Sequence, residues 1–331
     1  MLRHLKVPKF KAQEAKKYLE TKGALHEDFL PIKEDDFVFW PVKFEIDGEI
    51  VERKGNPVVK KSRDYRSHLS SEIKELAPKS FDIFGDIAIV KMPEVLMKHS
   101  GMIADALLIS NSNINKVALD SGVTGKYRIR ELKLLKGPSG FISTHKENGL
   151  LFTIDISKVY FSPRLATERQ RIANKVTGVE HVLDAFAGAA PFSVILAKKG
   201  CYVTSIDANP ESEKWARINF KQNHVPQSNY NFICSRVEDM IESLSPFDRV
   251  IMNNPMNSFA YIESLRDMVK LGGIVHFYYI GSMEDQLTVV NTFGADFRCL
   301  LTREVHPYSP SSSVMVSDLE RVNSTVQIIN Q

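Results

Sequence analysis

The chain has little cysteine and no long apolar segment. Its three cysteines, Cys201, Cys234 and Cys299, are scattered over 331 residues. They form neither a disulfide framework nor the paired spacing of a zinc site. No apolar run approaches the roughly 18–20 residues that a membrane-spanning helix needs, and Met1–Lys6 has no apolar stretch typical of a signal peptide. We therefore expect a cytoplasmic protein with no membrane partner and no structural metal.

Neither sign of charge dominates, because the formal net charge is only +3. Basic residues are instead concentrated in three segments, 1–17, 53–66 and 126–136. A local excess of Lys and Arg is what the neutralisation of phosphates requires. Solvated helix and loop surfaces have the same composition, however. Charge alone therefore leaves nucleic-acid binding open.

Glycine is also sparse, with 17 residues, but Gly188 lies in the small-residue run Asp184–Phe192 between an apolar stretch and a helical one. Gly and Ala let the backbone approach a ligand closely. Asp207, at the end of the next apolar run, is placed either to bind ribose hydroxyls or to cap a helix ahead of Pro210. The spacing is not G-x-G-x-x-G, which disfavours a nicotinamide dehydrogenase. The run D-x-F-x-G-x-x-P-F resembles the first motif of S-adenosylmethionine-dependent methyltransferases.

Beyond about residue 156, apolar strand candidates alternate with helices, which predicts a doubly wound parallel sheet. Two later β-rich runs, Phe297–Thr302 and Ser313–Ser317, are expected to form an antiparallel pair. With the motif above, this predicts an α/β fold of the class I methyltransferase type, Rossmann-like with a mostly parallel seven-stranded sheet. The expected strands are 181–184, 201–206, 230–234, 248–252 and 273–280, and the expected helices include Pro210–Gln222 and Phe259–Lys270.

Two small α+β domains are expected to precede this sheet, giving domains at 1–60, 61–155 and 156–331. In the first we predict a helix over Lys11–Thr21 and strands over Asp36–Pro41 and Val42–Ile46. In the second, the expected elements are a hairpin or strand over Ile83–Val90, a helix within Pro93–Ser110, and strands over Lys126–Leu132 and Gly149–Asp155.

Several segments together resemble the archaeal and eukaryotic tRNA (guanine-37, N1)-methyltransferases. The resemblance runs from about residue 81 to the C-terminus, while the N-terminal domain matches in layout only. It implies a tRNA-elbow-contacting N-terminal domain, a small middle domain and a class I methyltransferase domain, with S-adenosylmethionine as cofactor and tRNA as partner. The matching segments are Tyr127–Leu132, His145–Gly149, Val159–Leu165, Glu168-Arg169, Asp184–Phe192, Ile206-Asp207, Asn253–Pro255 and Gly272–His276.

Methylation at guanine N1 requires particular chemical groups in the site. N1 bears a proton, so methylation needs a carboxylate to take it and a donor for the charge that arrives on O6. By resemblance, Glu168 matches the general base and Arg128 the arginine that contacts O6, while Asn253 and Pro255 match the Asn-x-Pro that grips the base. Glu168 is also consistent with a first-turn helix acid and Arg128 with a phosphate contact.

The remaining predicted contacts follow from the same resemblance. We expect no metal ligand, and we expect His145 to shape a loop. Tyr160 is expected against the cofactor or the target base, with a core position as the alternative. For the substrate we expect Arg128, Asn254, Asn257 and Tyr308. The predicted cofactor contacts are Asp184, Phe186, Ala187, Gly188, Pro191, Phe192, Asp207, Asn253, Tyr160 and Arg169.

The sequence departs from the family pattern at two places. Arg236 stands where an acidic residue usually receives the adenine amino group, so either Glu238 or Asp239 is expected to substitute or backbone groups are expected to hold the adenine edge. The segment after Asn253 is unusually polar, with Asn254 and Asn257, which leaves open a second methylation at C7 of the tricyclic wyosine precursor, as in one archaeal branch. The alternatives are a wyosine-pathway aminocarboxypropyl transferase and a non-catalytic tRNA-binding protein. We expect a monomer.

Overall fold

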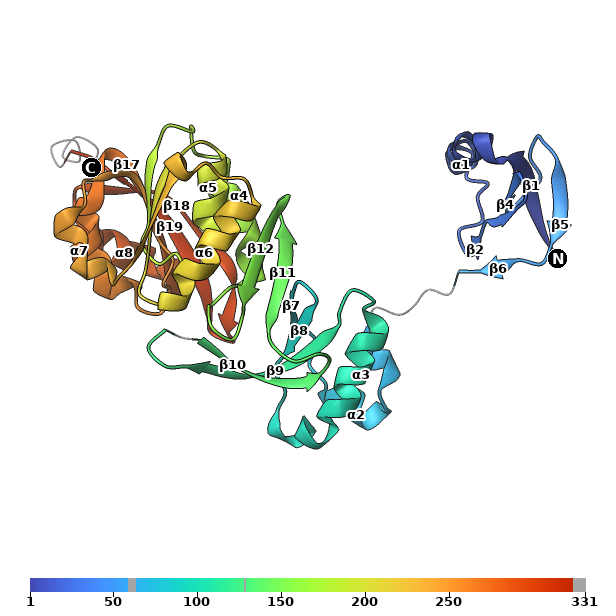
Figure 1. Ribbon diagram of the computed structural model, residues 1–331, viewed down its shortest axis with the longest axis horizontal. Coiled ribbons are helices and arrows are strands. Elements are labelled where there is room, and N and C mark those ends of the chain that lie inside the picture. Colours follow the sequence, from blue (N-terminus) through green and yellow to red (C-terminus); the bar gives the residue numbers. More distant parts are fainter. Residues whose placement is uncertain (59–63, 128, 324–331) are drawn as a thin grey trace. The chain divides into compact units, whose positions relative to one another are not determined.

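The computed structural model describes residues 1–58, 64–127 and 129–323. The chain divides into two compact units, residues 1–63 and residues 64–331 (Figure 1). The division into three domains expected from the sequence is finer than this and stays a prediction.

The first unit is a four-stranded antiparallel sheet in the order β3-β4-β1-β5 with one helix. Leu5 of β1 and Leu19 of α1 meet in a small core with Ala24 and Val42, so the helix is held by its one apolar face. The elements are β1 (Leu2–Pro8), α1 (Ala12–Thr21), β2 (Phe29–Leu30), β3 (Ile32–Glu34), β4 (Phe37–Pro41), β5 (Ile50–Arg53) and β6 (Asn56–Pro57).

The strand predicted over Val42–Ile46 is wrong, because only a single bridge forms at Val42. Strand β4 runs antiparallel to β1, with Pro41 opposite His4. Because β1 begins at Leu2, the chain beyond Val42 passes the end of the neighbouring strand. An alternating pattern cannot form a strand where no partner strand continues.

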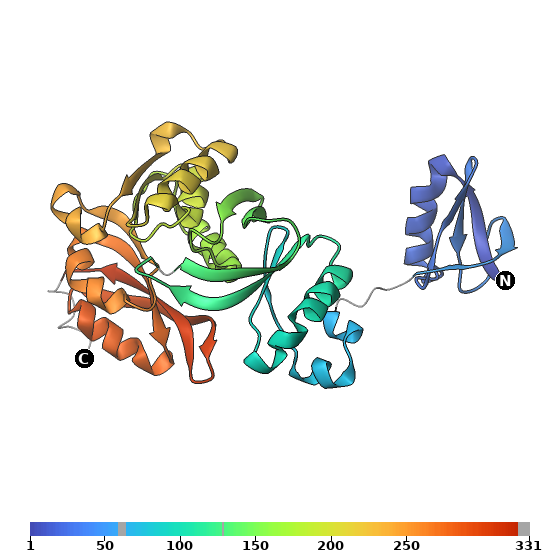
Figure 2. The ribbon, with the colours of Figure 1, turned by 60° about the horizontal axis from the view of Figure 1, so that its bottom comes forward.

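The second unit begins with a smaller sheet in the order β10-β9-β8-β7, with helices packed on one side of it (Figure 2). Ile103 and Leu107 of α3 pack in one apolar core with Val90 and Val117 of the sheet. Strands β8 and β9 are parallel, and the other neighbours are antiparallel. The elements are α2 (Ser71–Leu76), β7 (Asp82–Phe84), β8 (Ile87–Val90), α3 (Ser100–Ser110), β9 (Lys116–Thr124) and β10 (Ile129–Lys136).

Here the predicted hairpin over Ile83–Val90 is confirmed as β7 and β8. The helix predicted within Pro93–Ser110 is divided into a 3-10 helix at Glu94–His99 followed by α3. The strand predicted over Lys126–Leu132 begins at Ile129 in the structure, because Gly125–Tyr127 form a turn after β9.

A hairpin of β11 (Ile142–Glu147) and β12 (Leu150–Asp155) follows, and it is bound by side-chain amides of helix α6 (Pro210–Gln222) and of its C-cap Asn223. Asn219 Oδ1 accepts from Thr153 N at 2.8 Å, and Asn223 Oδ1 accepts from Leu151 N at 2.9 Å. These bonds satisfy the free edge of β12, so the hairpin is fixed to the part of the chain that follows it.

The last part of the chain is a seven-stranded sheet in the order β15-β14-β13-β16-β17-β19-β18. The five strands from β15 to β17 are parallel, and β19 and β18 are antiparallel to their neighbours. The strands are β13 (His181–Asp184), β14 (Tyr202–Asp207), β15 (Tyr230–Cys234), β16 (Phe247–Met252), β17 (Val269–Gly281), β18 (Phe297–Ser309) and β19 (Ser312–Arg321).

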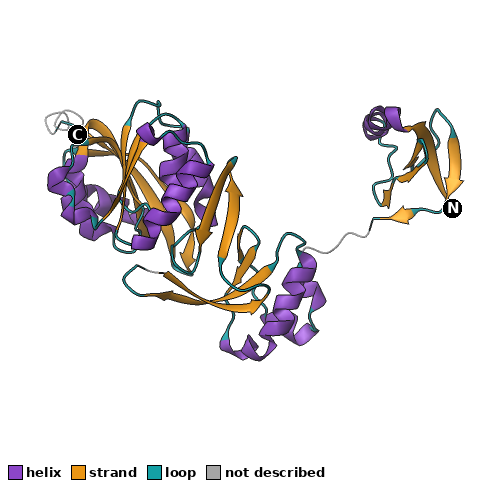
Figure 3. Ribbon diagram, viewed as in Figure 1, coloured by secondary structure: helices purple, strands orange, loops and turns teal. Residues whose placement is uncertain are grey.

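Helices cover both faces of this sheet, with α4, α5 and α6 on one face and α7 and α8 on the other (Figure 3). Each face has its own apolar core, one around Phe192 and Phe220 and one around Phe277 and Phe293. Both cores are needed because parallel strands are buried on both sides. The helices are α4 (Ala166–Ala173), α5 (Pro191–Lys198), α6 (Pro210–Gln222), α7 (Ile262–Leu265) and α8 (Gln286–Phe293). The predicted α/β fold with a mostly parallel seven-stranded sheet is confirmed.

The helix predicted over Phe259–Lys270 is wrong in its second half. The chain forms a 3-10 helix at Ser258–Tyr261, then the short α7, then a 3-10 helix at Arg266–Met268. Strand β17 already begins at Val269, which is fully buried and pairs with Phe247. Burial of this β-branched residue between strands decides the boundary against the local helical pattern.

Candidate active site

The small-residue loop between β13 and α5 lies at the carboxyl end of the parallel sheet, where open α/β sheets bind ligands. Gly188 (φ +53°) and Ala190 (φ +63°) both adopt the left-handed conformation. Ala187 N donates to Ile206 O at 2.9 Å, which ties the loop to β14. A Cβ on Gly188 would lie 3.5 Å from Tyr160 O, so the loop is close to backbone on its other side as well. The loop is a rigid, shallow cradle.

Asp207 ends β14 beside this cradle and is bonded to it. Its Oδ2 accepts from Gly188 N at 2.7 Å, and its Oδ1 accepts from Asn209 N and Ser212 Oγ, both at 2.9 Å. Burial raises the pKa of this carboxyl. Since Oδ2 receives one hydrogen bond, it retains a lone pair for a ligand hydroxyl. Asp207 therefore shapes the loop and keeps one oxygen able to accept a further hydrogen bond. The helix N-cap is Asn209, whose Oδ1 accepts from Glu211 N.

Asp184 supports the loop from inside. The side chain is buried, Oδ2 accepts from Ser193 Oγ at 2.7 Å, and Ser205 Oγ donates to that hydroxyl in turn. Burial raises the pKa of Asp184 to about 7. Its Oδ1 is buried without a hydrogen-bond partner among the described residues. A hydrogen-bond donor of a bound ligand would satisfy such a buried acceptor beneath a ligand-binding loop.

The aromatic residues of the loop divide into one that faces outward and one that faces the core. Phe186 is partly exposed and meets Tyr261 edge-on, with ring centroids 4.8 Å apart. Phe192 is buried and lies 6.0 Å from the ring of Tyr278. Pro191, also buried, begins α5. Phe186 and Tyr261 thus form an apolar wall beside the loop.

Arg169 is in the interior, with its guanidinium turned away from the exposed side of the loop. It donates to both carboxylate oxygens of Glu147 at 2.5 and 2.6 Å and to Ser162 O at 3.0 Å, and it lies 5.8 Å from the ring of Phe192. Three of its N–H donors are occupied by Glu147 and Ser162, and the predicted cofactor contact of Arg169 stays a prediction. Arg169 holds α4 against β11 and backs the loop through Phe192.

The polar segment after β16 is a rigid turn. Pro255 O accepts from Ile280 N at 3.1 Å, and Asn254 O accepts from Asn257 N at 3.0 Å and from Ser258 Oγ at 2.6 Å. Asn253, Asn254 and Pro255 are half-buried, and Asn257 is exposed. Tyr308, on β18, donates from its hydroxyl toward Met256 Sδ at 3.6 Å. Tyr308 is therefore beside this segment, Asn253–Ser258, which is predicted to hold the target base and is called the acceptor segment below.

Glu168 is in the first turn of α4 and is fully buried. Its Oε2 accepts from Arg171 Nε at 2.9 Å and from Tyr278 OH at 3.0 Å, and its Oε1 lies 2.7 Å from Arg303 Nη2. Burial and the neighbouring carboxylate hold the pKa of Tyr278 well above its usual range, so this phenol stays a donor. The carboxylate is paired and positioned rather than solvated.

The predicted guanine contact Arg128 lies outside the described residues. Its neighbour on β10, Arg130, pairs with Asp82 and Asp120, each at 3.2 Å, and its guanidinium lies 5.8 Å from the ring of Tyr160. Tyr160 is 46% exposed, so the predicted core alternative does not hold. Asp82 also accepts from Arg164 Nε at 2.8 Å, just before α4. Asp82 therefore links β10 to the turn that leads into Glu168.

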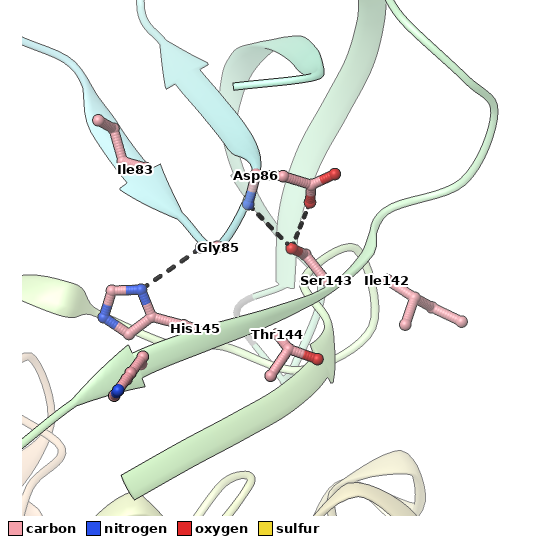
Figure 4. Close-up of a pocket in the computed structure, with 8 residues that line it drawn as sticks. Ile83, Gly85, Asp86, Ile142, Ser143, Thr144 and His145 are labelled. Carbon is pink, nitrogen blue, oxygen red and sulfur yellow. Dashed lines mark hydrogen bonds between the residues drawn. The ribbon is translucent and has the colours of Figure 1, made fainter. Parts of the chain in front are cut away.

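His145 has the loop-shaping position that was expected. Its Nδ1 accepts from Gly85 N at 3.4 Å, its ring stacks on Phe84 with centroids 5.4 Å apart, and burial lowers its pKa. Ser143 binds Asp86 alongside, and these residues line an open depression (Figure 4). A neutral, stacked imidazole holds β11 to the β7–β8 turn.

Arg236 is exposed and donates to Glu238 at 2.6 Å. Glu238, one of the two acids expected to contact the adenine, is thus paired with Arg236, while Asp239 is exposed. The substitution of either for the usual acidic residue stays a prediction.

Three residues that matter to this geometry were missed by sequence reasoning: Tyr278, Arg303 and Asp318. All three belong to strands β17, β18 and β19, and each acts on α4 across more than a hundred positions. No local pattern connects them to Glu168, because pairing of the two C-terminal strands decides which face each side chain takes.

Among the described residues, no helix is long and apolar enough to cross a bilayer. In the same part of the chain no group of His, Cys, Asp and Glu side chains is arranged to hold a metal ion.

A parallel sheet closed by an antiparallel pair, with a glycine loop and a strand-end carboxylate at its carboxyl edge, defines a class I methyltransferase fold. Family models for the TRM5/TYW2 methyltransferase domain, the TYW2 N-terminal domain and the tRNA methyltransferase 5 N-terminal domain match residues 143–296, 65–140 and 5–51. The chain belongs to the Trm5 family of tRNA (guanine(37)-N(1))-methyltransferases, and the family predicted from the sequence is confirmed.

The relatives cover nearly the whole chain. The Trm5b tRNA (guanine(37)-N(1))-methyltransferase of Pyrococcus abyssi is 34% identical over 92% of this chain and 95% of its own length. The crystal structure of that organism's Trm5b superposes with a TM-score of 0.74 at 32% identity, over 98% of this chain and 100% of the other. A Trm5 in complex with tRNALeu superposes with a TM-score of 0.73 at 28% identity, over 98% of this chain and 100% of the other.

Proposed function

We propose that this protein transfers a methyl group from S-adenosylmethionine to N1 of guanine-37 in the anticodon loop of tRNA. The names of the relatives support this substrate. The observation that carries the proposal is Tyr278, which donates to Glu168 from its hydroxyl and accepts from Ser258 Oγ at its carbonyl. Ser258 also donates to Asn254 O. The candidate base and the candidate acceptor segment are therefore held at a fixed separation by one residue.

The residues of the loop fit the proposed cofactor. S-adenosylmethionine carries a nucleoside with ribose hydroxyls and supplies a methyl group on a positively charged sulfur. Asp207 Oδ2 has the lone pair to accept a ribose hydroxyl, and the left-handed Gly188 leaves room for close approach. Phe186 and Tyr261 give an apolar wall for an adenine ring. Asp184 Oδ1 is the unpaired acceptor for an ammonium donor.

The chain's own groups account for the acceptor side of the reaction. The target base must leave its stack to reach a pocket of this kind. Asn253 and Pro255, fixed by the turn at Asn254–Ser258, grip its edge. Glu168 takes the proton from N1, and Arg128 is proposed to hold the charge on O6. Tyr308, beside Met256, is proposed to contact the base or an adjacent nucleotide.

The test is nucleoside mass spectrometry of tRNA incubated with enzyme and methyl-labelled cofactor, using otherwise identical transcripts with guanine or adenine at position 37. We expect N1-methylguanosine from the first transcript and no label in the second. Label at another position would exclude the proposed substrate.

Replacement of Glu168 tests the base directly. We expect Glu168→Gln to lower the single-turnover methylation rate by about 10²–10⁴-fold, the usual contribution of a general base. Cofactor affinity should stay within about threefold of wild type. Glu263→Gln, an exposed first-turn acid of α7, is the control and should leave the rate unchanged. A wild-type rate in Glu168→Gln would contradict the mechanism.

The rival transfer reaction gives a different distribution of label. An aminocarboxypropyl transferase would leave the methyl label on methylthioadenosine, whereas methyl transfer places it on tRNA. A precursor-bearing tRNA in the same assay tests C7 methylation. Part of the polarity of the acceptor segment has a structural role, because Ser258 is buried and bonds to two backbone carbonyls.

We further propose that the enzyme acts as a monomer in the cytoplasm, which light scattering and cell fractionation would test.

A further inference from the structure

The two oxygens of Glu168 have different surroundings. Oε2 is occupied by two well-aligned donors, Arg171 Nε and Tyr278 OH. Oε1 lies 2.7 Å from Arg303 Nη2, but the alignment is that of an ion pair and not of a hydrogen bond. Oε1 and Arg303 Nε are both buried without a hydrogen-bond partner among the described residues. Oε1 is thus the oxygen with a free lone pair.

Strand register brings Arg303 to this position. Val316 of β19 pairs with Tyr278 of β17 on one side and with Arg303 of β18 on the other. Residues paired across neighbouring strands point to the same face of a sheet. Tyr278 and Arg303 therefore reach Glu168 from one row of the sheet, on either side of Val316.

The other basic groups near Glu168 also bind Asp318. Arg171 donates to both oxygens of Asp318 at 2.6 and 3.1 Å, and Lys175 and His276 also contact Asp318, at 2.8 and 2.6 Å. Arg303 has no second acidic partner in the described part of the chain, and its side chain is 37% exposed. The titratable and charged groups around Glu168 are Arg171 and Lys175 from the α4 side, Tyr278 and His276 from β17, Arg303 from β18 and Asp318 from β19.

We propose that Arg303 is a positioning residue for methyl transfer: it holds the side chain of Glu168 in place and leaves Oε1, not Oε2, as the oxygen that takes the N1 proton. The N1–H bond breaks, its electron pair stays on the guanine nitrogen that attacks the methyl group, and the proton forms the new O–H bond on Oε1. Oε1 is buried and Arg303 is its partly exposed partner, so we expect the target base to approach from the side of Arg303. This inference rests on the proposed function.

The test is the pH dependence of the single-turnover methylation rate in Arg303→Gln and Arg303→Lys. A cation beside a carboxylate favours its charged form, so its removal lets the proton return at higher pH. We expect the acidic limb of the profile to move up by about one pH unit in Arg303→Gln. The rate should then be roughly tenfold lower on that limb and within about threefold of wild type on the alkaline plateau. Arg303→Lys keeps the charge and should move the limb by less than half as much.

Arg298→Gln is the matched control, since Arg298 is on the same strand and pairs with Glu320 at the surface. It should leave the profile unchanged. The melting temperature without cofactor, measured for all variants at pH 5 and pH 8, gives a second readout. The decrease in melting temperature on acidification should be greater in wild type than in Arg303→Gln, because the variant has no Arg303–Glu168 ion pair to lose.

Two outcomes would overturn the inference. An acidic limb at the wild-type position, with the rate lowered equally at every pH, would give Arg303 a merely structural role. A raised KM for tRNA with an unmoved limb would make it a phosphate contact. The proposed function fails separately, if Glu168→Gln methylates at the wild-type rate or if the methyl group is not on guanine-37.

Discussion

At the scale of single residues, the buried carboxyl group of Asp184 destabilises the loop unless a ligand donor pairs with it. Its carboxyl group is buried, receives one hydroxyl donor at Oδ2, and leaves Oδ1 without a partner among the described residues. Burial favours the neutral form, which is why its pKa rises to about 7. The loop is therefore less stable when Asp184 is charged, and a positively charged ligand would offset that cost.

This gives a prediction for Asp184→Asn. The folded-state pKa is above the unfolded value, so the folded protein holds the proton more tightly and its stability falls as pH rises from about 4 to about 7. We expect wild type to lose a few kcal/mol of unfolding free energy over that range relative to Asp184→Asn, whose curve should be flatter. Urea unfolding without cofactor at pH 5 and pH 8 measures this. The exposed Asp239→Asn should follow wild type, and parallel curves for wild type and Asp184→Asn would disprove the linkage.

At the scale of elements, helix α4 has a charged face that lies on the antiparallel end of the sheet. Asp318 on β19 receives Arg171, Lys175 and His276, and His276 in turn lies 2.7 Å from Arg249. These donors hold the pKa of Asp318 far below its usual range. Buried ion pairs of this kind contribute little net stability when intact but are costly to break. They fix where α4 sits, and so where Glu168 sits.

We therefore expect Asp318→Asn to lower the unfolding free energy at pH 7 by about 3–5 kcal/mol, because two cations, Arg171 and Lys175, and the neutral His276 lose their common partner. Since the folded pKa is depressed, this contribution is present above the unfolded pKa of about 4 and is lost as pH falls further. The gap between wild type and variant should close in acid. Glu320→Gln, on the same strand but paired at the surface with Arg298, should cost less than about 1 kcal/mol. Denaturant titrations at pH 7 and near pH 2 would show either result, since the loss begins only below about pH 4.

Elements with strong local signals were predictable, and those decided by distant partners were not. Apolar runs and the glycine loop defined β13, β14 and α5, and Pro210 marked the start of α6. The boundary at Val269 and the missing strand after Val42 depended on whether a neighbouring strand continued. Likewise Glu168, Asn253 and Tyr308 were accessible from the sequence, whereas Arg303 and Asp318 required the register of β18 and β19. The interior position of Arg169 had no sequence signal that separated it from Glu168.

At the scale of the whole molecule, the two compact units present different chemistry. The first unit has an exposed aromatic side chain, Phe10 at 83%, between the exposed Lys9 and Lys11. Lys17 is exposed on α1 nearby in sequence. Single-stranded or looped RNA is commonly bound by cations that meet phosphates and by aromatic faces on which bases stack. The second unit holds the loop, Glu168 and the acceptor segment.

We expect the triple variant Lys9→Gln, Lys11→Gln and Lys17→Gln to weaken tRNA binding while cofactor binding is unchanged. Each lost phosphate contact should reduce the slope of log affinity against log salt by about 0.7–0.9. Filter binding across a salt series measures this. A matched triple on the second unit, Lys199→Gln, Lys214→Gln and Lys221→Gln, controls for net charge. Equal losses in both triples would show that general charge, and not the first unit's surface, determines binding.

The position of Asp318 and Arg303 near the end of the chain has a consequence for biosynthesis. Helix α4 leaves the ribosome long before its partners, since Arg171 and Asp318 are 147 positions apart. Until β18 and β19 emerge and pair, Glu168 and Arg171 lack the groups that fix them. A nascent or truncated chain that ends before Arg303 can therefore already contain the glycine loop and Asp207, yet lack a positioned base. Such a fragment is expected to retain donor affinity but not to methylate, so activity requires that β18 and β19 are synthesised and paired.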